Sequence, residues 1–151
     1  RISNGDQNRN NGNDNKALVE EQTNQSINLK KFNDLNIKYS TITPTETGLT
    51  KSIFDAVSSV REFLKINGIH NYETQEFGPT NKVKKQAFFY DGNNETELEI
   101  SMYRSNGRGD FRIWISDIKP FVIPGEVLAL FIKDQKIFVG NITKYDYSNF
   151  L

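Results

Sequence analysis

The chain has 151 residues, with 19 basic and 19 acidic side chains, one histidine and no cysteine. Its length favours a single domain, and the absence of cysteine excludes disulfides and thiolate metal sites and fits a cytoplasmic protein. Because the charges balance, no general attraction to nucleic acid or to an anionic membrane is expected, so any such binding must be local. No apolar run reaches the length that a bilayer requires, and we expect no membrane partner.

The first 46 residues are predicted to be a disordered or loosely docked leader. They are rich in Asn, Gln, Asp, Lys and Thr, a composition that buries too little apolar surface to offset the entropy of the chain. We expect disorder from Arg1 to about Lys16. Scattered apolar residues from Leu18 to Ile37 indicate that the following segment docks as an arm. A single compact domain is then expected over residues 47–151.

One amphipathic helix is predicted at the start of this domain. Between residues 50 and 67, apolar side chains recur at helical spacing: Ile53, Val57, Val60 and Leu64. Thr47 or Thr50 would cap the start of this helix. Gly68 follows its end, where a left-handed residue is favoured.

The remainder of the chain predicts strands. Alternating or continuous apolar runs occupy residues 83–90, 96–103, 111–115, 127–132 and 136–142, with turn sequences between them. The run 127–132 is apolar throughout, which predicts burial on both faces. One helix followed by about five antiparallel strands indicates an α+β fold, barrel-like or a pseudobarrel.

The stretch from residue 104 to 112, which joins the second and third predicted strands, carries half of the arginines in the chain. If these strands pair as a hairpin, one face gathers cations and aromatic rings: Tyr103, Arg104, Arg108, Arg112 and Trp114. A guanidinium binds phosphate or a guanine edge through paired hydrogen bonds, and an exposed ring stacks on an unpaired base. Lys82, Lys84 and Lys85 would extend this face. The pattern therefore predicts a nucleic-acid interface.

A purely structural role is the alternative for the same side chains. Arg104 and Arg112 would then form cross-strand ion pairs with Glu97, Glu99 or Asp110. Trp114 would belong to the core. The only histidine, His70, lies in a polar loop and lacks the second histidine or cysteine that a zinc site needs, so a surface position is expected. We expect no metal and no cofactor.

Two other functions stay open. The pattern acidic-x-Lys, found in metal-dependent nucleases, occurs as Asp117-Ile-Lys119 and as Asp134-Gln-Lys136. A second carboxylate would have to come from Asp91, Glu97 or Asp110. The other possibility is a protein-interaction barrel whose hairpin or Asn-rich leader binds a partner chain.

Three segments carry a resemblance to a known family: Gly-Ile-His-Asn-Tyr at 68–72, Tyr-Arg-x-x-x-Arg-Gly-Asp-Phe-Arg-Ile-Trp-Ile at 103–115, and Pro-Gly-Glu-Val-Leu-Ala-Leu at 124–130. Over residues 63–142 the chain resembles DNA-targeting domains of prokaryotic restriction endonucleases. The resemblance implies a pseudobarrel similar to the DNA-binding barrel of plant transcription factors, with a separate domain or partner chain that cuts DNA. It also implies that certain residues face DNA: Tyr103, Arg104, Asn106, Arg108 and Arg112. We therefore predict a non-catalytic DNA-recognition domain.

Overall fold

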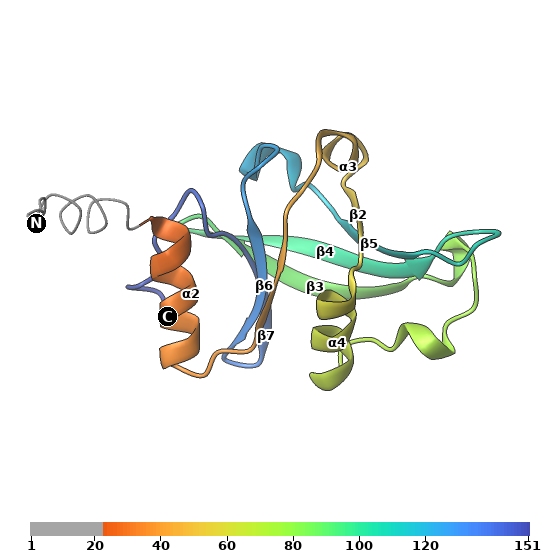
Figure 1. The fold of residues 1–151 in the computed structure, drawn as a ribbon, viewed down its shortest axis with the longest axis horizontal. Helices are drawn as coiled ribbons and strands as arrows, with labels where there is room; N and C mark the ends of the chain where they lie inside the picture. The colour runs from red at the N-terminus through yellow and green to blue at the C-terminus, as the bar shows by residue number, and fades with distance from the viewer. Residues whose placement is uncertain (1–22) are drawn as a thin grey trace, which may run out of the picture.

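The computed structural model describes residues 23–151 (Figure 1). The predicted disorder of residues 1–16 lies outside this range. The helices are α2 (Asn24–Asp34), α3 (Glu46–Lys51) and α4 (Ser58–Ile66), with short 3-10 helices at Tyr72–Thr74, Pro79–Asn81 and Lys119–Phe121. The strands are β1 (Tyr39–Ile42), β2 (Ile53–Asp55), β3 (Val83–Tyr90), β4 (Glu95–Arg104), β5 (Phe111–Ile115), β6 (Leu128–Lys133) and β7 (Lys136–Asn141).

The strands form one sheet in the order β1-β6-β7-β3-β4-β5-β2. This sheet curls into a nearly closed barrel (Figure 1). Neighbouring strands are antiparallel except for β3 and β7, which run parallel. The predicted α+β, barrel-like fold is thus confirmed, but the sheet is mixed and has seven strands where about five antiparallel strands were expected.

Two apolar clusters hold the barrel together. The larger fills its interior and includes alternate residues of β4, Leu98, Ile100 and Met102, as the sequence pattern predicts. The second lies on the outer face of β6 and β7, beneath α2 and the C-terminal residues. Because β6 contributes to both clusters, its residues 128–131 are buried on both faces, which confirms the reading of that apolar run.

Residues 24–46, expected to belong to a leader, contribute a helix and a strand to this domain. Thr23 and Ser26 form a capping box that starts α2, and Phe32 of this helix is fully buried against Phe131. Strand β1 pairs with β6 along four residues. The boundary expected near residue 47 therefore falls inside α3 and not between domains.

The single helix predicted over residues 50–67 is wrong in its first half. Helix α3 ends at Lys51, its C-cap residue Ser52 adopts the left-handed conformation (φ 58°), and the chain then enters β2. Strand β2 pairs with β5, and α4 begins only at Ser58. Pairing with a strand 57 residues away along the chain overrides the local helical spacing, because Phe54 and Ala56 reach the barrel interior from an extended backbone.

Candidate nucleic-acid interface

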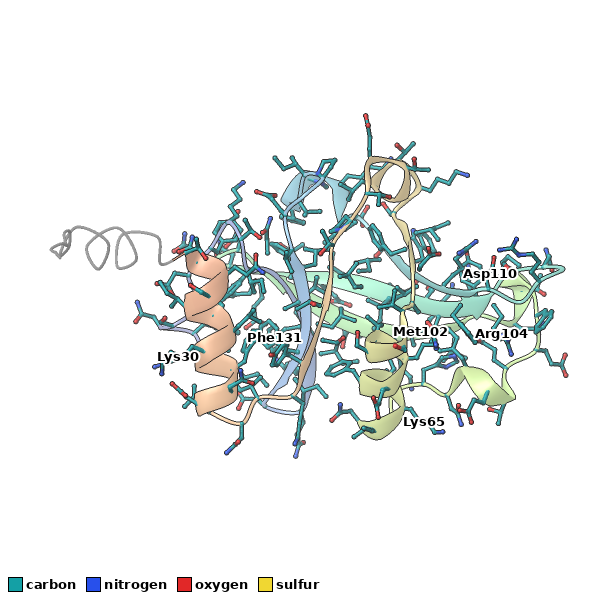
Figure 2. The ribbon with its side chains drawn as sticks, viewed as in Figure 1. Lys30, Lys65, Met102, Arg104, Asp110 and Phe131 are labelled. Atoms are coloured by element: carbon teal, nitrogen blue, oxygen red, sulfur yellow. The ribbon has the colours of Figure 1, made fainter. Side chains whose placement is uncertain are left out.

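The β4–β5 hairpin projects from the end of the molecule opposite α2 (Figures 1 and 2). Its tip closes through two backbone hydrogen bonds, from Ser105 N to Asp110 O (2.8 Å) and from Gly109 N to Ser105 O (3.0 Å). The Ser105 hydroxyl also accepts the N–H of Asp110. Gly107 and Gly109 supply the positive φ angles of 76° and 73° that this tight path requires.

Phe77 anchors the hairpin tip to the loop after α4. Its ring lies against Gly109, so closely that a Cβ atom at Gly109 would overlap it. Phe77 also forms a parallel bridge with Arg104. The Arg104 guanidinium lies 4.6 Å from the centre of the Phe77 ring and 4.7 Å from that of Phe111, and its Nε donates to Gly109 O. Arg104 therefore stabilises the tip from within.

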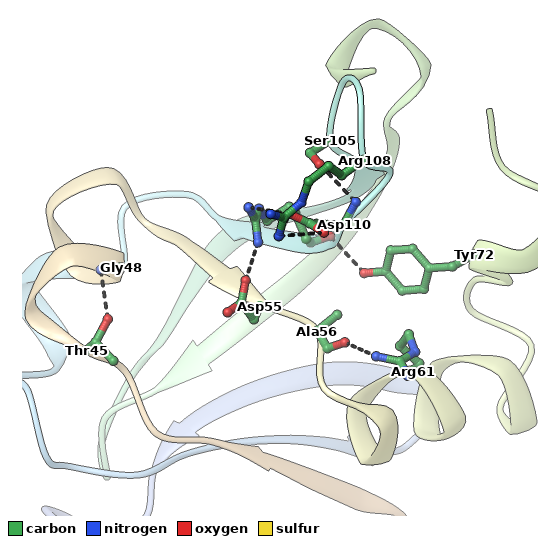
Figure 3. Close-up of polar contacts among 10 residues, drawn as sticks. Thr45, Gly48, Asp55, Ala56, Arg61, Tyr72, Ser105, Arg108 and Asp110 are labelled. Carbon is green, nitrogen blue, oxygen red and sulfur yellow. Dashed lines mark hydrogen bonds and ion pairs between the residues drawn. The ribbon is translucent and has the colours of Figure 1, made fainter. Parts of the chain in front are cut away.

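A chain of ion pairs links the tip to strand β2 (Figure 3). Arg112 pairs through one terminal nitrogen with Asp55 and through the other with Asp110 at 3.3 Å. Arg108 reaches the same Asp110 carboxylate at 3.3 Å, yet its side chain is 84% exposed. Of the ion pairs considered for Arg112, the one with Asp110 is thus present, but it joins residues two apart along the chain; the cross-strand partner is Asp55 of β2. Arg108 keeps most of its guanidinium in solvent.

The remaining predicted residues divide between the two faces of the sheet. Tyr103 lies opposite Arg112, and Lys84 lies in the same row as Ser101 and Trp114, so these side chains share the outer face. Lys82 covers the half-buried Trp114 ring at 4.9 Å. Lys85 pairs in register with Ile100 and belongs to the other face, so it does not extend this surface as expected. Asn106 is exposed at the tip.

A groove of about 790 Å³ runs beside the hairpin, between β5 and the β1–α3–β2 segment. We call it the threonine groove because four threonines at alternate positions line it: Thr41, Thr43, Thr45 and Thr47. Tyr103 and Arg112 form part of its wall, and Lys51, Asp55 and Ser59 complete the polar lining. Thr45 caps α3 by accepting the Gly48 N–H, as Figure 3 shows. Among the described residues, the other three threonine hydroxyls have no hydrogen-bond partner, so they can bind a polar ligand.

Sequence reasoning missed the threonine groove because most of its lining comes from the expected leader and from the misassigned helix. The alternation of Thr at 41, 43, 45 and 47 was the available signal. Strand β1 ends at Ile42, so only the first part of that alternation reflects strand geometry.

The residues of the nuclease alternative do not assemble into a metal centre in the described part of the chain. Asp117 is exposed and adopts a positive φ of 56° just before the 3-10 helix that begins at Lys119. Asp134 pairs with Lys133 in an exposed turn. Within residues 23–151, no three His, Asp or Glu side chains lie close enough together to hold a metal ion.

His70 lines a separate polar cavity of about 530 Å³ beside the loop after α4. Its Nε2 lies 2.9 Å from Gln75 Oε1, while the Gln75 amide donates to the carbonyls of Asn81 and Met102. The Gln75 oxygen must therefore accept, and His70 donates from Nε2. Burial lowers the pKa of His70, although the bond to Gln75 opposes this, and the charge of Lys85 lowers the pKa further. The imidazole is half-buried rather than a free surface residue.

Comparison of the chain with models of protein families, with curated proteins and with solved structures found no match. In the described residues, no helix has the length and apolar character needed to cross a membrane.

Proposed function

We propose that this chain is a DNA-recognition domain of a restriction-type protein, which binds duplex DNA with the β4–β5 hairpin and the threonine groove. The observation that carries the proposal is the exposed guanidinium of Arg108, presented at a tip that Phe77 anchors. A tip already fixed before binding avoids the entropic cost of ordering a loop on DNA. The resemblance of residues 63–142 to DNA-targeting domains supports the restriction context.

The cations around the hairpin have distinct surroundings, and we expect them to make different contacts with DNA. Arg108 faces solvent and is suited to phosphate, while Arg112 lies between two carboxylates at the wall of the groove. Lys51 and Lys84 add charge at the groove and on the neighbouring face. Hydroxyls of the threonine groove can donate to phosphate oxygens. Since the total charge is zero, binding to random sequence should be modest and sensitive to salt.

Fluorescence anisotropy of a labelled duplex tests this proposal at two salt concentrations. We expect binding at low salt that weakens as salt rises, because Lys and Arg displace counterions from the phosphates. Arg108→Ala should weaken binding to every sequence and reduce the slope of log affinity against log salt by about 0.9, the value for one lost phosphate contact.

The matched control is Lys30→Ala, which removes the same charge from α2 at the opposite end of the molecule (Figure 2). This variant should bind DNA like the unmodified protein. Equal losses in both variants would show that only total charge matters and would refute the hairpin as the binding element. A protein that ignores duplex and single-stranded DNA at low salt would refute the proposal and favour a protein partner.

A further inference from the structure

Three side chains form a row across the outer face of β2, β5 and β4. Asp55 is the register partner of Arg112, and Arg112 is in turn the register partner of Tyr103. Residues directly opposite each other in neighbouring strands project from the same face of a sheet. All three line the threonine groove, so a ligand in the groove meets a carboxylate, a guanidinium and a phenol ring side by side.

Within this row, Asp55 and Arg112 form an ion pair, which we call the central pair. In the described part of the chain, both residues of the central pair have hydrogen-bonding atoms that are still free. A guanidinium has five N–H groups, and Arg112 directs one to Asp55 and one to Asp110. Among the described residues, its other N–H groups have no partner. Asp55 accepts from Arg112 with one oxygen, and its side chain is 75% exposed. Unmatched donors and an unmatched acceptor therefore lie next to each other.

This pair is poorly suited to grip a phosphate. The two carboxylates that contact Arg112 cancel its charge, and the exposed Asp55 would repel an approaching anion. The ligand that complements Arg112 and Asp55 is the edge of a planar group that offers hydrogen-bond acceptors to the guanidinium and a donor to the carboxylate. In the major groove, a G·C pair presents guanine O6 and N7 as acceptors and the cytosine N4 amino group as a donor.

We propose that Asp55 and Arg112 determine specificity by reading a G·C base pair of the bound duplex. Arg112 donates to guanine O6 and N7, and Asp55 accepts from cytosine N4. Asp110 holds the Arg112 guanidinium in place by pairing with the terminal nitrogen that does not contact Asp55. The inference rests on the proposed DNA-binding function and assigns base reading to Arg112 and phosphate binding to Arg108.

The test begins with selection of preferred sites from a random duplex pool, followed by anisotropy on single-pair replacements. We expect the selected site to contain a G·C pair whose replacement by A·T weakens binding by roughly 5- to 150-fold, the usual discrimination of one bidentate contact. In Asp55→Asn, this discrimination should fall at that position only. Arg112→Lys should relax the same position, because an ammonium lacks the planar fork.

Asp134→Asn is the matched control, since it removes the same charge from an exposed turn. Asp134 has a left-handed backbone, a conformation that asparagine tolerates. It should keep the preference of the unmodified protein. Sequence-dependent binding that keeps its G·C preference in Asp55→Asn, or DNA binding with no G·C preference at all, would overturn this inference alone. A protein that binds no DNA would overturn the proposed function as well.

Discussion

The two ends of the molecule are both built on aromatic contacts, but they differ in how their polar groups are used. At the aromatic end, formed by α2, β6, β7 and residues 143–151, the buried Asn28 side chain donates to the carbonyls of Ile142 and Tyr145 and accepts the Tyr147 N–H. The Tyr147 hydroxyl donates to Tyr90 O and accepts the Asn141 N–H. These groups have the partners that burial requires.

The hairpin end is formed by the tip of β4–β5, the loop after α4 and the threonine groove. Several of its polar groups have hydrogen-bonding atoms that lack a partner among the described residues. Arg108 is mostly exposed, and Arg112 and Asp55 each retain atoms without a partner among the described residues. Buried side chains that satisfy one another stabilise a fold, whereas partly paired side chains at a groove are available to a ligand. Stability therefore rests on the aromatic end, and the unpaired polar groups of the hairpin end are available for the recognition role that we propose.

The largest expected effect comes from breaking the aromatic end. Phe32→Ala removes a fully buried ring that packs on Phe131 and Tyr39, and we expect it to reduce the free energy of unfolding by about 3 to 5 kcal/mol. Urea denaturation followed by circular dichroism measures this loss. Leu35→Ala, at the exposed C-cap of the same helix, should change stability by less than about 0.5 kcal/mol. A loss of unfolding free energy in Phe32→Ala as small as that in Leu35→Ala would show that α2 is not part of the cooperative fold.

A smaller loss is expected from loosening the hairpin tip. Gly107 and Gly109 share nearly the same positive φ, but only Gly109 contacts the Phe77 ring, and nothing described lies within 4 Å of a Cβ atom at Gly107. Gly107→Ala should cost about 1 to 2 kcal/mol of backbone strain. Gly109→Ala should cost about 1 to 3 kcal/mol more, because the methyl group displaces Phe77. Urea denaturation of both variants measures the difference, and equal losses would show that Phe77 does not anchor the tip.

Long-range pairing explains which elements the sequence could reveal. The strands at 83–90, 96–103 and 111–115 follow one another through short turns, so their alternation and their turn residues predict them directly. In one of these turns the Asp91 carboxylate accepts hydrogen bonds from the N–H groups of Asn93 and Asn94. These two bonds lower the pKa of the Asp91 carboxyl, and the bond from Asn94 has the larger effect. Strands β1 and β2 are four and three residues long and pair with distant strands, so each is too short for a local pattern to predict it.

The same reasoning separates the two partners of Arg112. Asp110 is two residues away along the chain and was a candidate partner from sequence alone, whereas Asp55 is 57 residues away, inside the segment assigned to a helix. A helical Asp55 would not lie in register with β5. Asp55 could therefore be identified as a partner of Arg112 only from the pairing of β2 with β5.

The smallest expected effect is a pH dependence that distinguishes the two ends. His70, the only histidine of the chain, lies at the hairpin end, and burial lowers its pKa below the usual value of 6.5. The unfolded chain therefore takes up this proton before the folded protein does, so stability should decrease as the pH falls through about 6.5. His70→Gln keeps an amide donor for Gln75 but does not titrate, so its stability should fall less over the same range. Unfolding free energies measured from pH 5 to pH 8 test this, and hydrogen exchange should show the acid-induced opening in residues 68–83 before α2. Parallel curves for the two proteins would mean that the imidazole is equally basic in the folded and unfolded states, and that acid sensitivity has its origin in the carboxylates instead.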